Sequence, residues 1–172
     1  MPDQAMPDQA MSERAMSEKA MTIRVQAEDF DIAAEIEALS AGRVDIGAVV
    51  SFTGLCREEK GVLAALELEH YPGMAEAEMT RICREAVERF DLQGITAIHR
   101  YGRIGPGGRI VLVIAASSHR QAAFDGAAFV MDYLKTAAPF WKKEHLKDGT
   151  ARGWVSAKDA DDTARDRWRR GS

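Results

Sequence analysis

The sequence predicts an α+β fold, in which one sheet-and-helix domain holds most of the chain. Two segments carry apolar residues at helical spacing, Met74–Phe90 and about His119–Thr136, and short β-rich runs separate them. The 172 residues are enough for one sizeable core, and a composition of 46% hydrophobic and 29% charged residues is typical of a globular protein. The expected order β-α-β-β-α-β-β-α-β indicates a sheet covered by helices.

In the first half of the chain, three segments are expected to form strands because they are β-rich or alternate between apolar and polar residues. They are Thr22–Gln26, Ile46–Gly54 and Leu63–Tyr71, and a charged loop over Cys56–Val62 joins the last two. A short helix is expected over Asp29–Leu39. The helix over Met74–Phe90 follows Pro72, a residue that suits a helix start.

In the second half, Gly94–Gly102 predicts a strand and Gly105–Gly108 a turn. Arg109–Ala116 is the most apolar run and is expected to be the central strand. Ser118 and Gln121 have capping-box spacing, so Ser118 is the expected N-cap of the following helix, and Pro139 marks the end of that helix. "RGWVSA" predicts a final strand.

Both ends of the chain differ from this domain, which we assign to residues 21–156. Residues 1–20 repeat every five residues, with Met at each repeat start and almost no large aliphatic side chains. Two interpretations remain open: a disordered tail, or a misassigned start with Met21 as the first functional residue. Residues 157–172 form a charged tail, for which a helix is one interpretation.

Composition and motifs exclude several protein classes. A formal net charge of -4 argues against a general nucleic-acid binder, and no apolar run approaches the ~18 residues of a membrane span. The two cysteines, Cys56 and Cys83, belong to no CxxC or Cys/His cluster, so we expect neither a metal site nor a disulfide framework, and no cofactor. Reduced cysteines and the lack of a signal peptide favour a cytoplasmic protein. The chain has no P-loop, GxGxxG or Ser/His/Asp pattern.

A cationic pair lies where the central strand passes into the long helix. His119 and Arg120 occupy the first helical turn, where positive charge opposes the helix dipole. Local stability therefore does not explain them, and a phosphate or carboxylate site at the helix N-terminus would. The alternative is that Arg120 points into solvent or pairs with a distant carboxylate.

The stretch "DYLKTAAPFWKKE" combines lysines with aromatic residues. Lys135 follows Phe124 and Met131 at spacings of eleven and four residues, near the apolar stripe of its helix, where partial desolvation would make its amine reactive. Alternatively, a lysine in the last helical turn simply complements the dipole. Phe140 and Trp141 are expected to anchor the chain after Pro139.

The third candidate is the loop in "FTGLCREEK". Arg57 follows a strand end, a common position for a binding residue. Cys56 beside it is either a low-pKa thiolate or, as we favour in the absence of an adjacent base, a buried inert thiol. His70 and His99 flank strands and are interpreted as ordinary structural residues.

Five segments in order carry a family resemblance: "GAVVSFTGLCRE", "LELEHYPGM", "IHRYGRIGPGG", "SSHRQAAF" and "MDYLKTAAPFWKKE". Together they resemble the large, catalytic subunit of molybdopterin synthase, over roughly residues 22–155. The resemblance implies an α/β hammerhead-type fold with an additional β-rich part. It also implies a sulfurtransferase that takes sulfur from the C-terminal thiocarboxylate of a small ubiquitin-like partner. The substrate would be cyclic pyranopterin monophosphate, and the assembly a heterotetramer built around a homodimer.

The resemblance also implies the site residues. Its two catalytic lysines fall on Lys135 and Lys142, and the full substrate-binding set falls on Leu55, Cys56, Arg57, His119, Arg120, Lys135, Lys142, Lys143 and Glu144. Two rival functions stay open: a non-catalytic adaptor that binds an anion or carboxylate tail in the same basic pocket, and a thiol enzyme that uses Cys56.

Overall fold

The computed structural model describes residues 19–155 and 159–169, and the expected α+β fold is confirmed with two four-stranded sheets. The first sheet, in the order β1-β4-β6-β2, contains β1 (Ala20–Gln26), β4 (Gly94–Arg100), β6 (Arg109–Ser117) and β2 (Ala48–Leu55). The second, in the order β5-β3-β7-β8, contains β5 (Gly102–Ile104), β3 (Leu63–His70), β7 (Phe140–Leu146) and β8 (Ala151–Val155). The helices are α2 (Ile32–Ser40), α3 (Met74–Phe90), α4 (Arg120–Thr136) and α5 (Asp159–Asp166), and a 3-10 turn η1 (Arg167–Arg169) follows α5.

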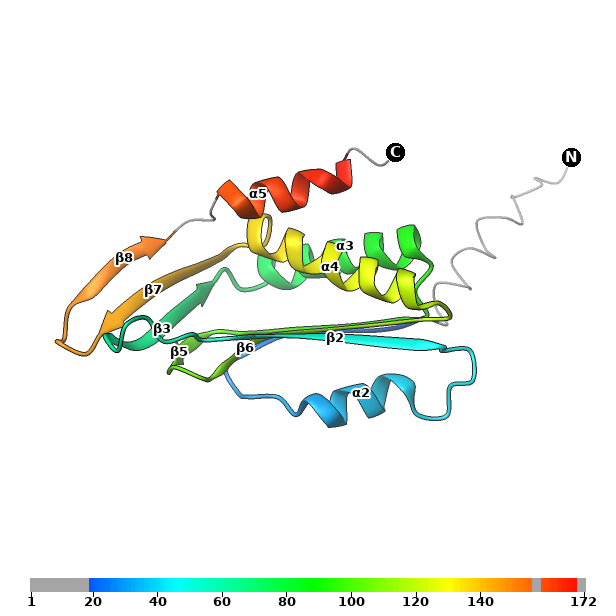
Figure 1. Ribbon diagram of the computed structural model, residues 1–172, viewed down its shortest axis with the longest axis horizontal. Coiled ribbons are helices and arrows are strands. Elements are labelled where there is room, and N and C mark those ends of the chain that lie inside the picture. Colours follow the sequence, from blue (N-terminus) through cyan, green and yellow to red (C-terminus); the bar gives the residue numbers. More distant parts are fainter. Residues whose placement is uncertain (1–18, 156–158, 170–172) are drawn as a thin grey trace, which may run out of the picture.

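The first sheet is covered by helices on both faces. Figure 1 shows α3 and α4 above it and α2 below it. Alternate residues of β6 face the two sides: Val111 and Val113 join the core under α3 and α4, whereas Leu112 and Ile114 join the core over α2. Burial of both faces explains why β6 is a continuous apolar run, and its predicted interior position is confirmed.

The second sheet extends past one end of the first, away from α3 (Figure 1). It has its own small core, in which Leu63, Leu68 and Ile104 pack with the buried Cys56. Because Cys56 directly follows β2, this core joins the end of the first sheet to the second.

The predicted helix over Met74–Phe90 is confirmed at both ends. The carboxylate of Glu76 accepts a hydrogen bond from the Gly73 N–H at 2.8 Å, which satisfies a free donor at the helix start. Asp91 then adopts a left-handed conformation with φ 50° and ends the helix.

Three local predictions are wrong. The segment Gly94–Gly102 is not one strand, because it divides at Tyr101 into β4 and β5, which belong to different sheets. Pro139 does follow the end of α4, but the residues after it form β7, where no strand was expected. Trp141 on this strand is 43% exposed, so of the two aromatic residues only the half-buried Phe140 serves as an anchor.

The predicted capping box of α4 is also absent. The N-cap is His119, whose backbone is extended and whose side chain makes no capping hydrogen bond. The Ser118 hydroxyl instead donates to the Asp45 carbonyl at 3.2 Å, and the Gln121 amide donates to Asp125 at 3.0 Å. Ser118 thus ties the strand end to a neighbouring loop.

At the ends of the chain, β1 begins at Ala20, and the rest of the repeat, residues 1–18, lies outside the described residues. The expected last strand is found as β8, although residues 156–158 also lie outside the described part. In the charged tail, α5 and η1 are helical, and Trp168 packs edge-on against Phe90 and Phe129 with ring centroids 5.5 Å apart. Within residues 19–155 and 159–169, no helix is long and apolar enough to cross a membrane.

Candidate functional site

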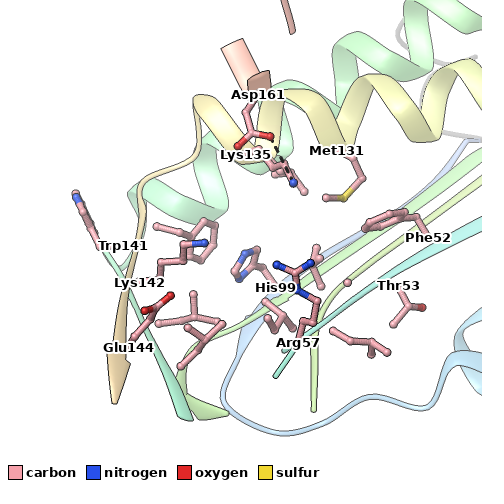
Figure 2. A pocket seen from close by; sticks show the side chains of 18 of the residues that line it. Phe52, Thr53, Arg57, His99, Met131, Lys135, Trp141, Lys142, Glu144 and Asp161 are labelled. Carbon is pink, nitrogen blue, oxygen red and sulfur yellow. Dashed lines mark hydrogen bonds and ion pairs between the residues drawn. The ribbon is translucent and has the colours of Figure 1, made fainter. Parts of the chain in front are cut away.

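A cavity of about 650 Å³ opens where the two sheets meet below the C-terminal end of α4 (Figure 2). This volume suits a small organic substrate. Its walls come from the ends of β2, β4 and β6, the last turn of α4, strands β3 and β7, and one residue of α5. The lining residues are Phe52, Thr53, Gly54, Leu55, Arg57, Glu59, Leu63, Leu66, Leu68, His99, Ile110, Val111, Met131, Leu134, Lys135, Phe140, Trp141, Lys142, Glu144 and Asp161.

The end of β2 is shaped by a close approach and by a turn. A Cβ atom at Gly54 would lie 2.6 Å from Cγ1 of Val111, so only glycine allows this approach without displacing the valine. Cys56 then donates its N–H to the Gly108 carbonyl at 2.8 Å and accepts from the Gly107 N–H at 2.6 Å. The predicted turn over residues 105–108 thereby fixes the start of the loop that carries Arg57.

Lys135 extends from the last turn of α4 toward the cavity, near Met131 (Figure 2), and Leu134 of the same turn also lines the cavity. Its side chain is 53% exposed and its ammonium lies 3.4 Å from the Asp161 carboxylate of α5. Of the two interpretations left open by the sequence, the structure therefore favours a solvated lysine in the last helical turn over a desolvated one. The lysine is a half-exposed cation at the cavity rim, positioned by the helix and by a carboxylate.

Strand β7 divides the "FWKKE" residues between two faces. Lys142 and Glu144 line the cavity, and Glu144 forms an ion pair with Arg152 at 3.2 Å. Lys143 does not line it, because strand side chains alternate, and its ammonium lies 5.8 Å from the ring of Trp154. Lys142 and Lys135 therefore share one cavity and Lys143 lies outside it.

The β2 loop contributes Leu55 and Arg57, both exposed, to the cavity. The Arg57 side chain is 82% exposed and pairs with Glu59 at 3.3 Å. Cys56 between them points away: it is 1% exposed and does not line the cavity. Burial raises the pKa of its thiol, and a hydrogen bond from the Leu66 backbone and the charge of Lys142 oppose that rise only in part. The burial that the favoured interpretation requires is confirmed, and the inertness of the thiol stays a prediction.

The cationic pair at the other end of α4 lies apart from this cavity. His119 and Arg120 are exposed and neither lines it. Lys135 lies sixteen residue positions after His119 along α4, which is about 24 Å at ~1.5 Å per residue. One chain alone does not bring the two groups together.

His99, interpreted from the sequence as structural, is a cavity residue. It lies at the end of β4, is 9% exposed, and stacks on Phe140 with ring centroids 3.7 Å apart and an interplanar angle of 15°. Burial lowers the pKa of its imidazole to about 4, partly offset by a hydrogen bond to the Arg100 backbone, so the ring is neutral near pH 7. The sequence signal was weak, because Phe140 lies 41 residues away and on an unpredicted strand.

The cavity is suited to a flat, anionic ligand. Arg57, Lys135 and Lys142 supply positive charge, and Phe52, His99 and Phe140 supply aromatic surface. Two of the cations are already paired with carboxylates. Lys142 has no carboxylate at ion-pair distance among the described residues, so it is the cation most ready to receive an anion.

Comparison with known proteins places the chain among close relatives. A family model described as "MoaE protein" matches residues 25–137. The molybdopterin synthase catalytic subunit of Rhizobium meliloti (strain 1021) is 73% identical over 149 residues, which cover 87% of this chain and 96% of that relative.

Two solved structures are similar over most of their length. The molybdopterin biosynthesis MoaE protein from Burkholderia ambifaria MC40-6 has a TM-score of 0.74 and 48% identity, covering 86% of this chain and 97% of that one. The molybdopterin synthase from Staphylococcus aureus has a TM-score of 0.68 and 32% identity, covering 75% and 95% respectively.

Proposed function

The chain belongs to the MoaE protein family, and we propose from this premise that it is the catalytic subunit of a molybdopterin synthase. It transfers sulfur from the C-terminal thiocarboxylate of a small ubiquitin-like partner to cyclic pyranopterin monophosphate. The product is the dithiolene of molybdopterin, in molybdenum cofactor biosynthesis. The observation that carries this proposal is 73% identity over 87% of the chain to a relative of that name.

The chemistry of the cavity supports the assignment. The substrate carries a phosphate and the sulfur donor is an anion, so both gain from cations in a site with apolar walls. Lys135 and Lys142 enter this cavity from different elements, α4 and β7, and Arg57 enters from the loop after β2. The flexible tail of the small partner and the flat ring system of the pterin substrate would therefore meet between cations rather than at a single charged group.

Lys135 is the central catalytic group in this proposal, with Lys142 assisting. Each thiocarboxylate sulfur forms a new carbon–sulfur bond as a carbon–oxygen bond of the substrate breaks and its oxygen leaves protonated; water then hydrolyses the acyl–sulfur bond and returns the tail as a carboxylate. The two ammonium groups polarise or protonate at this junction, where negative charge develops. Because Asp161 already holds Lys135 at the cavity rim, little ordering is needed when the tail arrives.

His119 and Arg120 complete the site from a second copy of the chain in this proposal. Their separation of about 24 Å along α4 from Lys135 excludes direct cooperation within one protomer. In a homodimer at the centre of a heterotetramer, the exposed pair of one copy would reach the cavity of the other and bind the phosphate. Leu55 and Glu144 then border the same site, whereas Lys143 lies on the opposite face of β7.

The cytoplasm is the proposed location. Both cysteines, Cys56 and Cys83, are free and buried, which is typical of a reducing compartment.

Reconstitution tests the function. The full chain is mixed with the thiocarboxylated small partner and cyclic pyranopterin monophosphate, and molybdopterin is assayed after each component is omitted in turn. Molybdopterin should form only in the complete mixture. Binding of the partner's tail without molybdopterin formation would refute the proposal and favour the non-catalytic adaptor.

A further inference from the structure

His99 presents a defined hydrogen-bond acceptor to the cavity. Its Nδ1 lies 2.8 Å from the carbonyl oxygen of Arg100. A carbonyl oxygen only accepts, so Nδ1 carries the proton, and the neutral ring leaves a lone pair on Nε2. The tautomer is thus determined by the backbone of β4.

Nε2 is reachable from the cavity. Among the described residues, Nε2 of His99 has no hydrogen-bond partner. Every fully buried side-chain nitrogen or oxygen in those residues does have one. Nε2 is therefore open to solvent although the ring as a whole is only 9% exposed. Figure 2 shows the imidazole between Arg57 and Lys142, in the interior of the cavity.

The ring is also held in a fixed plane. It stacks on Phe140 at 3.7 Å, and Phe140 lies two residues before Lys142 on the same face of β7. This contact joins β4 of the first sheet to β7 of the second. A fixed plane fixes the direction of the Nε2 lone pair, which makes it selective for a donor in one position.

The charged groups that line the cavity are less suited than His99 to accept a hydrogen bond from a ligand. The three cations only donate hydrogen bonds. The carboxylates of Glu59, Glu144 and Asp161 are each bound to a cation within the protein. His99 is thus an uncharged acceptor beside an aromatic wall, which suits a ring N–H rather than a phosphate.

We propose that His99 is a substrate-positioning residue that accepts a hydrogen bond at Nε2 from a ring N–H of the bound pterin. This inference rests on the proposed function and assigns the ring end of its substrate, while the cations take the anionic end. Recognition of the N–H edge would orient the pterin carbons toward Lys135 and Lys142.

Variants separate the acceptor from the ring. His99→Phe keeps a ring to stack on Phe140 and removes the acceptor, whereas His99→Gln restores an oxygen near the position of Nε2. The matched control is His70→Gln, because the His70 ring also lies near Phe140, at 6.3 Å, but does not line the cavity. KM and kcat for the pterin substrate are measured in the reconstituted reaction, with the melting temperature of each variant.

His99→Phe should raise KM about tenfold, the usual effect of one lost hydrogen bond. His99→Gln should recover most of that loss, and His70→Gln should leave KM unchanged. An unchanged KM in His99→Phe, or an equal rise in His99→Phe and His99→Gln, overturns the proposal.

Direct binding gives a result that depends neither on turnover nor on the folding of a variant. In wild-type protein labelled with nitrogen-15 in histidine, addition of the pterin substrate without the sulfur donor should move the Nε2 resonance of His99 far more than its Nδ1 resonance. An unmoved Nε2 resonance with saturating substrate contradicts the inference. Absence of molybdopterin in the reconstituted wild-type reaction would contradict the proposed function instead.

Discussion

Acidification from pH 7 to pH 5 should destabilise the wild-type protein more than a His99→Phe variant. His99 is buried without charge, and burial lowers the pKa of its imidazole from 6.5 to about 4. The unfolded chain binds a proton at this residue below about pH 6.5, whereas the folded chain binds it only near pH 4. The contribution of the neutral His99 to the free energy of unfolding is therefore fully present above pH 6.5 and is lost as the pH falls toward 4.

The magnitude follows from the two pKa values. At pH 7 both states are almost neutral and His99 contributes little pH dependence. At pH 5 the unfolded imidazole is almost fully protonated and the folded one almost fully neutral, which lowers the free energy of unfolding by about 2 kcal/mol. Below pH 4 the loss levels off at about 3 kcal/mol.

Urea unfolding at pH 7, 6 and 5 measures the effect in both proteins. Asp45 and Asp148 accept hydrogen bonds from Arg43 and Thr150 respectively, which lower the pKa values of their carboxylates. Protonation of these carboxylates in acid also destabilises the folded protein, but it does so equally in the wild type and the variant. The difference between the two profiles therefore isolates His99. Parallel profiles would refute the claim that a neutral imidazole is buried at this position.

Four further substitutions, one of them a control, test packing and chemistry. Gly54→Ala should cost about 1–3 kcal/mol in urea unfolding, because its Cβ would lie 2.6 Å from Val111; a cost near zero would contradict the close approach. Phe129→Ala removes a fully buried ring and should cost about 3–5 kcal/mol, whereas Phe124→Ala, at a 55% exposed position, should change stability by less than about 0.5 kcal/mol. Cys56→Ser should retain sulfur transfer, because its thiol is buried outside the cavity; loss of transfer by folded protein would revive the thiol-enzyme hypothesis.

The parts of the fold that could be predicted from sequence are those fixed by local pattern. The helix Met74–Phe90 has an apolar stripe and a start after Pro72, and these two signals agree. Strand β6 is apolar throughout because both of its faces are covered. In each case neighbouring residues carry the information.

Strand β7 could not be predicted, because its pattern depends on partners distant in sequence. Phe140, Lys142 and Glu144 share one face of the strand. Phe140 packs on His99, Lys142 borders the cavity and Glu144 pairs with Arg152. No simple alternation of apolar and polar residues results. The segment therefore looks like a mixed loop until β3 is placed beside it.

The candidate site was predictable only in part for the same reason. The family resemblance named Lys135, Lys142 and Arg57, which the fold brings to one cavity. It also grouped them with His119, which one chain holds about 24 Å from Lys135 along α4. His99 was missed because its burial and its stacking arise only when the two sheets meet.

The central claim is that Lys135 performs chemistry at the sulfur-transfer junction. The direct measurement is molybdopterin formation by Lys135→Ala in the reconstituted reaction, beside Lys147→Ala as a matched control. Lys147 is also a half-exposed lysine, 58% exposed and paired with Glu58 at 3.2 Å, but it lies outside the cavity.

Lys135→Ala should lower the rate of molybdopterin formation by at least about a hundredfold, as expected when a charge-stabilising group is removed. Its melting temperature and its affinity for the small partner should stay near those of the wild type, because an exposed ion pair contributes little to stability. Lys147→Ala should behave as wild type in all three measurements. Near-normal turnover by Lys135→Ala would contradict the account.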